Sequence, residues 1–205
     1  MRRRNRVVGH IVMVLAVAAC IPPRPSPTPP PATPSASLPP ATASPAGSPA
    51  SGGVIVDPTL LDVLPTDIQG TALAPDPDSA ADIAADGSVA PFVSAIALAA
   101  AFGPAATDTP LDYVIATVSR LRPGTFSEVF FRGWRDTFDA AVCEQAGGVS
   151  GNAEAEIGGR RTFIGSCAGG VRTYHAYLEG RDVIVSAHSA GAARYGEQLM
   201  AGLTE

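Results

Sequence analysis

The clearest structural pattern in the chain is the sequence NAEAEIGGRRTFIGSCAGGVRTYHAYLEGRDVIVSAH, residues 152–188. It divides into four runs of strand length, separated by glycine-containing dipeptides. Such dipeptides between runs of this length are typical of tight turns that join antiparallel strands. The strands are expected at residues 152–157, 160–167, 171–178 and 181–188. This stretch therefore predicts a four-stranded antiparallel meander.

The segment before the meander predicts a central strand and a helix. Residues 111–120 carry apolar side chains on both sides of an extended chain, which indicates a strand covered on both faces. A helix is expected from Thr125, which forms a capping-box pattern with Glu128. An aromatic residue stands at every fourth position from Phe126 to Phe138, so this stripe is expected to lie in the core.

The N-terminal half and the last residues predict further helices. Asp57-Pro58 is typical of an N-cap followed by proline at the first helical position, so a short helix is expected there. Residues 75–88 are expected to form an acidic loop. Residues 89–102 are apolar on nearly all sides and indicate a buried helix. A final helix is expected over residues 190–202.

These elements predict one α+β domain over residues 53–205. Its sheet is expected to be mostly antiparallel, built from the C-terminal meander and the central strand. The helices are expected to pack on one face of that sheet.

Five polar side chains of the last two predicted strands share one face. If Glu179-Gly180 is a two-residue turn, Tyr177 pairs with Asp182, and the alternation of strand side chains fixes the rest. The five residues are His175, Tyr177, Asp182, Ser186 and His188. This face is expected to point to solvent, with a polar binding face as the alternative. The two histidines would be about 13 Å apart in this register, too far to share a metal ion.

Ser189 lies in a pattern that approaches a hydrolase motif. The sequence Ala187-His188-Ser189-Ala190-Gly191 follows a strand and precedes a helix, as a nucleophile elbow does. That elbow needs a later histidine, and none follows Ser189. Ser189 is therefore expected to be an N-cap of the final helix. No catalytic residue, cofactor or metal site is predicted.

Three cysteines are present, and the last two form a natural pair. Cys143 and Cys167 stand on different predicted elements and do not form a CxxC motif. Disulfides persist in exported proteins, and the N-terminus described next indicates export. A Cys143–Cys167 disulfide is therefore predicted.

The N-terminus has the three parts of an export signal. Four arginines fall within the first six residues, an apolar run follows from Val7 to Ala19, and small residues precede a cysteine. The run is shorter than the roughly 18–20 residues that a permanent membrane span requires. Residues 1–19 are therefore expected to be a signal peptide.

The end of this signal carries a modification motif, Val17-Ala18-Ala19-Cys20. Here the chain resembles the bacterial lipoproteins, whose lipobox is an aliphatic residue, two small residues and a cysteine. The resemblance covers only the first twenty residues. It implies cleavage before Cys20 and a diacylglyceryl thioether on its sulfur, and so a membrane anchor on the extracytoplasmic side.

Residues 20–52 are dominated by Pro, Ala, Ser and Thr, a composition that cannot form a packed core. They are expected to be a disordered tether. Removal of the four signal arginines leaves 10 basic residues against 19 acidic ones, a formal charge near −9. Such a balance argues against a nucleic-acid partner, because binding to phosphates needs basic patches.

The sequence thus predicts a lipid-anchored, extracytoplasmic protein whose α+β domain binds an envelope partner or a small ligand. Two alternatives remain open. One is an extracytoplasmic serine hydrolase that uses Ser189 or Ser186 with His175 or His188. The other is a structural protein of the cell envelope.

Overall fold

The computed structural model describes residues 52–104 and 111–205. The predicted signal peptide, Cys20 and all of the predicted tether except Gly52 lie outside the described residues. The described strands are β1 Ile55–Val56, β2 Asp67–Ile68, β3 Thr71–Ala72, β4 Ala74–Pro75, β5 Val93–Phe102, β6 Tyr113–Leu121, β7 Val149–Ile157, β8 Arg160–Cys167, β9 Arg172–Leu178 and β10 Val183–Ala190. The helices are η1 Pro58–Val63, α1 Pro77–Ala85, α2 Glu128–Glu144, η2 Glu179–Arg181 and α3 Tyr195–Ala201.

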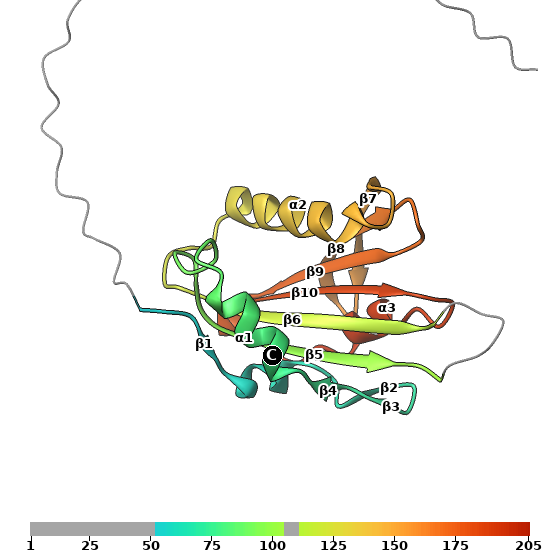
Figure 1. Cartoon of the computed structure of the whole chain (residues 1–205), viewed down its shortest axis with the longest axis horizontal. Coiled ribbons are helices and arrows are strands. Elements are labelled where there is room, and N and C mark those ends of the chain that lie inside the picture. The colour runs from blue at the N-terminus through green and yellow to red at the C-terminus, as the bar shows by residue number, and fades with distance from the viewer. Residues whose placement is uncertain (1–51, 105–110) are drawn as a thin grey trace, which may run out of the picture. The chain divides into compact units, whose positions relative to one another are not determined.

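One eight-stranded sheet organises the domain (Figure 1). Its strand order is β1-β5-β6-β10-β9-β8-β7, and β4 pairs with β5 beside this path. Every pair of this sheet is antiparallel except β1 with β5. The sheet-rich α+β class, the C-terminal meander and the central position of β6 are confirmed.

The first turn of the meander explains why its register is well defined. Gly158 and Gly159 both have positive φ, at 60° and 75°, and they join β7 to β8 in a two-residue turn. Only glycine adopts two such angles in succession at low cost, and this twist suits a hairpin. Glu156 consequently lies opposite Arg161, as the turn position predicts.

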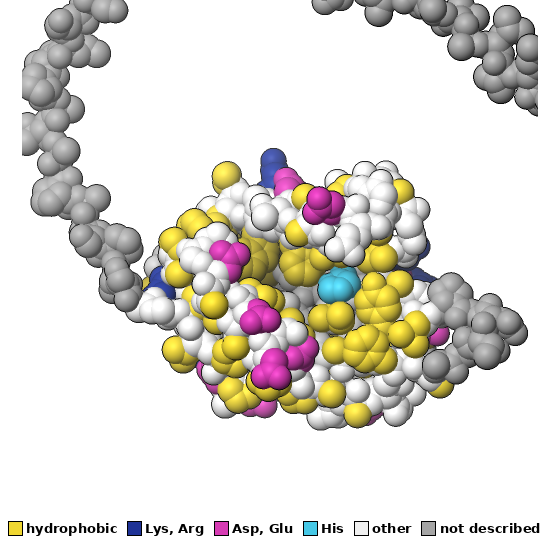
Figure 2. All heavy atoms as spheres, in the orientation of Figure 1, with side chains coloured by type: hydrophobic (Ala, Val, Ile, Leu, Met, Phe, Trp, Pro, Cys, Tyr) yellow, Lys and Arg dark blue, Asp and Glu magenta, His cyan; other side chains and the backbone are white. Residues whose placement is uncertain are grey.

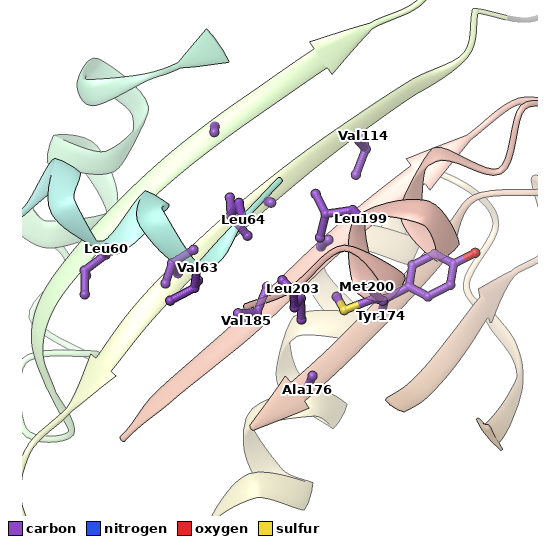
Figure 3. Close-up of a cluster of buried hydrophobic side chains, with 14 of the residues drawn as sticks. Leu60, Val63, Leu64, Val114, Tyr174, Ala176, Val185, Leu199, Met200 and Leu203 are labelled. Atoms are coloured by element: carbon purple, nitrogen blue, oxygen red, sulfur yellow. The ribbon is translucent and has the colours of Figure 1, made fainter. Parts of the chain in front are cut away.

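One face of the sheet, which we call the closed face, is covered by η1 and α3. Leu60 and Val63 of η1 and Leu199 and Met200 of α3 pack against strand side chains in a single apolar cluster (Figure 3). The strand side chains of this cluster that come from β6, β9 and β10 are Val114, Ala116, Val118, Tyr174, Ala176, Leu178, Val183, Val185 and Ala187. Burial of this cluster is the main apolar contribution to stability.

The other face, which we call the open face, lies beneath α1 and α2. Ala80 of α1 packs with Ile96 and Leu98 of β5, and Phe131 of α2 packs with Ile184 of β10. Helices therefore cover both faces, and the prediction that they pack on one face is not confirmed.

Residues 89–102 were predicted as a helix, and this prediction is wrong. The chain turns through Phe92 and then forms β5. Alternate alanines of β5 from Ala95 to Ala101 join the closed-face cluster, while Ile96 and Leu98 face α1. A strand buried on both faces is apolar at successive positions, and it resembles a buried helix in sequence.

Residues 75–88 were predicted as a loop, but they contain α1. Asp76 is its N-cap and accepts a hydrogen bond from the Ser79 backbone N–H at 3.1 Å, with Pro77 at the first helical position. The same Asp-Pro pattern at Asp57-Pro58 begins η1, as predicted. An Asp-Pro pair therefore begins a helix at both positions.

The boundaries of the two C-terminal helices also differ from the prediction. The N-cap of α2 is Ser127, whose hydroxyl accepts from the Phe130 N–H at 3.1 Å, and not Thr125. Strand β10 continues through Ala190, and α3 begins only at Tyr195. Ser189 is consequently a buried strand residue and not a helix cap.

The Cys143–Cys167 disulfide is present, and it joins the last turn of α2 to the end of β8. It fixes one end of α2 over the meander. Within residues 52–104 and 111–205, no helix has both the length and the apolar character that crossing a membrane requires.

Candidate functional site

A groove with a volume of about 570 Å³ opens between α2 and the segment that links α1 to β5. Its floor is formed by β5, β6 and β10. We call it the α2 groove, and its lining residues are Ile83, Asp86, Ser88, Val89, Phe92, Ile96, Thr117, Ser119, Val129, Phe130, Gly133, Trp134, Thr137, Phe138, Ala141 and Ser186. Figure 2 shows hydrophobic side chains around a hollow on this face of the molecule.

The walls of the α2 groove are aromatic and partly exposed. Phe92 is 42% exposed and Val129 is 83% exposed. The rings of Phe92 and Phe130 lie 5.3 Å apart, and the Trp134 ring lies 6.0 Å beyond Phe130. Apolar side chains that are exposed next to one another often mark an interaction site or a ligand-binding groove. The aromatic stripe of α2 was predicted to be core, but Phe130, Trp134 and Phe138 line the groove instead.

A chain of hydrogen bonds begins at two residues that line the groove, Trp134 and Ser186, and continues beneath α2 to side chains that do not line it. The Trp134 Nε1–H donates to Ser186 Oγ at 3.1 Å, and Ser186 Oγ lies 3.0 Å from His175 Nδ1. His175 Nε2 lies 2.9 Å from Asp139 Oδ1, and the Thr173 hydroxyl donates to the same oxygen at 2.5 Å. We call these five side chains the polar network.

The hydrogen-bonding capacities of the network give one consistent set of directions when His175 is neutral. The Asp139 carboxylate only accepts, so a neutral His175 carries its proton on Nε2 and accepts at Nδ1. Ser186 then donates to Nδ1 and accepts from Trp134. Every polar hydrogen in this chain is used, which is the condition under which a buried polar network is stable.

The pKa of Asp139 follows from this arrangement. Burial by itself raises the pKa of this carboxyl, but hydrogen bonds from His175 and Thr173 outweigh burial and hold the pKa below its usual value. Asp139 is only 5% exposed, and the guanidinium of Arg135, one turn earlier in α2, lies 3.8 Å from the centre of the Phe163 ring.

Gly165 makes room for the polar network. A side-chain carbon at this position of β8 would lie 2.3 Å from Thr173 Oγ1 and 2.5 Å from Asp139 Oδ2. Glycine is therefore required here by close approach. This glycine and the polar residues at alternate positions of β9 are the sequence signals that could have located the network.

The predicted polar face exists, but it does not point to solvent. His175 is fully buried and Ser186 is 1% exposed, because α2 covers them. The connection from β9 to β10 is longer than the predicted two-residue turn, and Leu178 pairs with Val183. This shifts the register by two residues and places His175 opposite Ser186. A shift of two keeps the same side chains on the same face.

Tyr177 and Asp182 belong to the same face but lie away from the α2 groove. The Tyr177 hydroxyl donates to Asp182 at 2.9 Å, and its ring stacks on Phe126 with a centroid distance of 3.6 Å. Burial, together with the adjacent carboxylate, raises the pKa of Tyr177 to about 12. The Tyr177–Asp182 pair lies beside the connection from β9 to β10, and neither residue lines the groove.

His188 lies in a second hollow, of about 520 Å³, near the C-terminal end of α2. Its ring packs against Tyr113 and Phe138, with centroid distances of 5.8 and 6.2 Å. Burial lowers the pKa of His188. Within the described residues its Nδ1 has no hydrogen-bond partner. The two hollows share Ala141, so they adjoin along α2.

Ser189 is separated from both histidines by the sheet. It lines a small pocket with Tyr174 on the closed face, whereas His175 and His188 lie on the open face. The predicted hydrolase pair of Ser189 with a histidine is therefore not formed, and Ser186 with His175 is the pair that the fold brings together.

The described residues contain no group of His, Cys, Asp and Glu side chains that could hold a metal ion. The chain was compared with protein-family models, with curated proteins and with solved structures, and nothing in these three comparisons matches it.

Proposed function

We propose that this protein is an extracytoplasmic lipoprotein, anchored through Cys20, whose domain binds an apolar ligand of the cell envelope in the α2 groove. The observation that carries the ligand-binding part is the groove itself. It is concave, it is lined mainly by hydrophobic and aromatic side chains, and it has a few polar groups at its floor, as small-molecule sites do.

The polar network supports this proposal because it makes the groove rigid. Trp134 is fixed by its hydrogen bond to Ser186, and Ser186 is fixed in turn by His175. The disulfide holds the far end of α2. A groove whose walls are already ordered loses little conformational entropy when a ligand enters.

The membrane anchor is proposed from the N-terminal motif, and it has its own test. Metabolic labelling with radioactive palmitate should mark the wild-type chain, and Cys20→Ser should remove the label and leave the precursor uncleaved. Labelled lipid on the Cys20→Ser chain would refute the anchor without affecting the ligand proposal.

Ligand binding can be followed by the fluorescence of Trp134, because this is the only tryptophan in the chain. The chain from residue 20 onward, with Cys20→Ser so that no acyl group of its own competes, is titrated with decanol. The Trp134 emission should shift with saturation, since the ring lines the groove.

Two exposed phenylalanines provide a matched test of location. Phe92 lines the α2 groove, whereas Phe102 is 55% exposed and lies outside it. Phe92→Ala should weaken decanol binding several-fold, because it removes a wall of the site, and Phe102→Ala should not. Equal effects of the two substitutions would place the binding elsewhere.

A second candidate function is a serine hydrolase, and the Ser186–His175–Asp139 geometry favours it. Ser186 Oγ would attack an ester carbonyl carbon and pass its proton to His175 Nδ1, and Asp139 would stabilise the imidazolium. The proton would then go to the leaving alkoxide, and water would hydrolyse the acyl-enzyme.

This candidate ranks second because of where Ser186 sits. The residue is in the middle of β10 and is paired with β6 and β9, so nearby backbone N–H groups belong to the ladder and do not form an oxyanion hole. Labelling of Ser186 by a fluorophosphonate in the folded chain, absent in Ser186→Ala and retained in Ser189→Ala, would promote the hydrolase above the binding protein.

A further inference from the structure

We infer that the ligand of the α2 groove is a single uncharged amphiphile, whose hydrocarbon part lies between the aromatic walls and whose hydroxyl or carbonyl group hydrogen-bonds to Ser119. This inference rests on the proposed ligand-binding function and names the chemical class of the ligand.

Ser119 is the residue that points to a polar group on the ligand. It stands on β6 at the floor of the groove and is 1% exposed. Across residues 52–104 and 111–205, nothing forms a hydrogen bond with its Oγ. A buried polar atom without a partner costs about 1–3 kcal/mol, and most such atoms in proteins are satisfied. An incoming group that pairs with Ser119 would recover this cost.

The other buried serine of the floor shows why Ser119 is distinct. Ser186 Oγ accepts from the Trp134 Nε1–H and is hydrogen-bonded to His175 Nδ1, so the folded domain already uses its hydroxyl. Ser119 lies on the neighbouring strand, opposite Ile184, and lines the same groove. Of the two buried serines of the floor, one therefore has its hydroxyl occupied and the other has a hydroxyl without a partner.

The charge of the lining residues decides whether the ligand carries a charge. Asp86 is the only charged residue among those that line the groove, and no basic residue is among them. A carboxylate or phosphate buried here would have no counterion, and burial of an unpaired charge is strongly unfavourable. An alcohol or an ester group meets the Ser119 hydroxyl without this penalty.

The burial of Ser119 favours a single ligand molecule inside the groove over a membrane surface that rests on the rim of the groove. A headgroup plane that rested on the rim, at the exposed Phe92 and Val129, would not reach a hydroxyl that is 1% exposed at the floor. A volume of about 570 Å³ lies in the range of sites that enclose small ligands.

The test compares four ten-carbon probes by the emission of Trp134 in the chain from residue 20 onward with Cys20→Ser. Decanol and methyl decanoate should bind more tightly than decane, which has no hydrogen-bonding group, and more tightly than decanoate. Ser119→Ala should weaken decanol binding about 2- to 10-fold and leave decane binding unchanged, as expected for one hydrogen bond.

Ser119→Ala should fold at least as well as the wild type, because the hydroxyl it removes has no partner. Ser189→Ala is the matched control, since Ser189 is a buried serine on the closed face, and its decanol affinity should equal that of the wild type.

The outcomes separate the two levels of the proposal. If none of the four probes changes Trp134 emission, the proposed function fails and this inference with it. If decanoate binds as tightly as decanol, or if Ser119→Ala leaves decanol affinity unchanged, the ligand class is wrong while the groove remains a binding site. Co-sedimentation with phosphatidylcholine vesicles that is unaffected by Ser119→Ala would show a membrane-docking surface and would overturn the inference.

Discussion

The closed and open faces of the sheet carry different kinds of side chains. On the closed face, small alanines of β5 and branched residues of β6 and β10 let η1 and α3 lie directly on the strands, and the cluster is apolar throughout. On the open face, large aromatic side chains of α2 face the sheet, and the strands beneath carry Thr117, Ser119 and Ser186. A groove of about 570 Å³ remains between the helix and the strands.

The difference shows how one sheet can support both stability and binding. Close packing on one face supplies apolar burial, which is the dominant favourable contribution to folding. The open face is held by a disulfide and a hydrogen-bonded chain, which position α2 without filling the space beneath it. Substitutions should therefore have different consequences on the two faces.

The largest loss of stability is expected from Leu199→Ala on the closed face. Leu199 is fully buried in α3, so its truncation should lower the free energy of unfolding by about 2–5 kcal/mol. Phe130→Ala on the open face should cost less, because Phe130 is already partly exposed in the groove. Urea unfolding followed by circular dichroism measures both. A greater loss for Phe130→Ala would contradict the division of roles between the faces.

Removal of the disulfide should have the next largest effect. The double substitution Cys143→Ser/Cys167→Ser opens a loop with a sequence separation of 24 residues, and the chain-entropy relation gives a loss of about 3 kcal/mol. Hydrogen exchange should rise mainly in α2, since its end is released, and remain low in α3. Uniform exchange across both helices would mean that the bond stabilises the whole domain and not the open face.

Much of the fold could be predicted because turn chemistry is local. The glycines at 158 and 159 determine a hairpin by their own φ angles, and the meander follows from them. The error at residues 89–102 has the opposite cause. Whether Ala95 to Ala101 form a helix or a strand depends on both neighbouring layers, and those layers come from distant parts of the chain.

The candidate site was only partly predictable for a related reason. The alternation of side chains along β9 and β10 predicts that His175 and Ser186 share one face. This prediction is correct although the predicted register was wrong by two residues, because a shift of two does not change the face. What the alternation could not show is that α2 covers that face. Asp139 meets His175 across a sequence separation of 36 residues, so this contact is determined by the tertiary structure.

The two buried serines of the groove floor should respond differently to truncation. Ser186→Ala leaves Trp134 and His175 without their partner and should cost about 1–3 kcal/mol, with a change in Trp134 emission. Ser119→Ala removes an unpaired hydroxyl and should be neutral or slightly stabilising. Denaturant titration of both variants checks this, and equal costs would show that Ser119 has a partner in solution.

The smallest expected effect is a pH dependence carried by His188. Burial lowers the pKa of His188 below its ordinary value of 6.5, so the unfolded chain binds the proton more readily than the folded domain. The stability that this group contributes is complete above pH 6.5 and is lost as the pH falls through the folded pKa. His188→Gln should remove this part of the decline. Asp139 also has a lowered pKa, so its contribution changes with the same sign, but it is lost at lower pH, as the pH falls below the ordinary carboxyl value of 3.8. Denaturant titrations of the wild type and His188→Gln between about pH 4.5 and 7.5 therefore isolate the histidine, and parallel profiles of the two proteins would show that water reaches its ring in the second hollow.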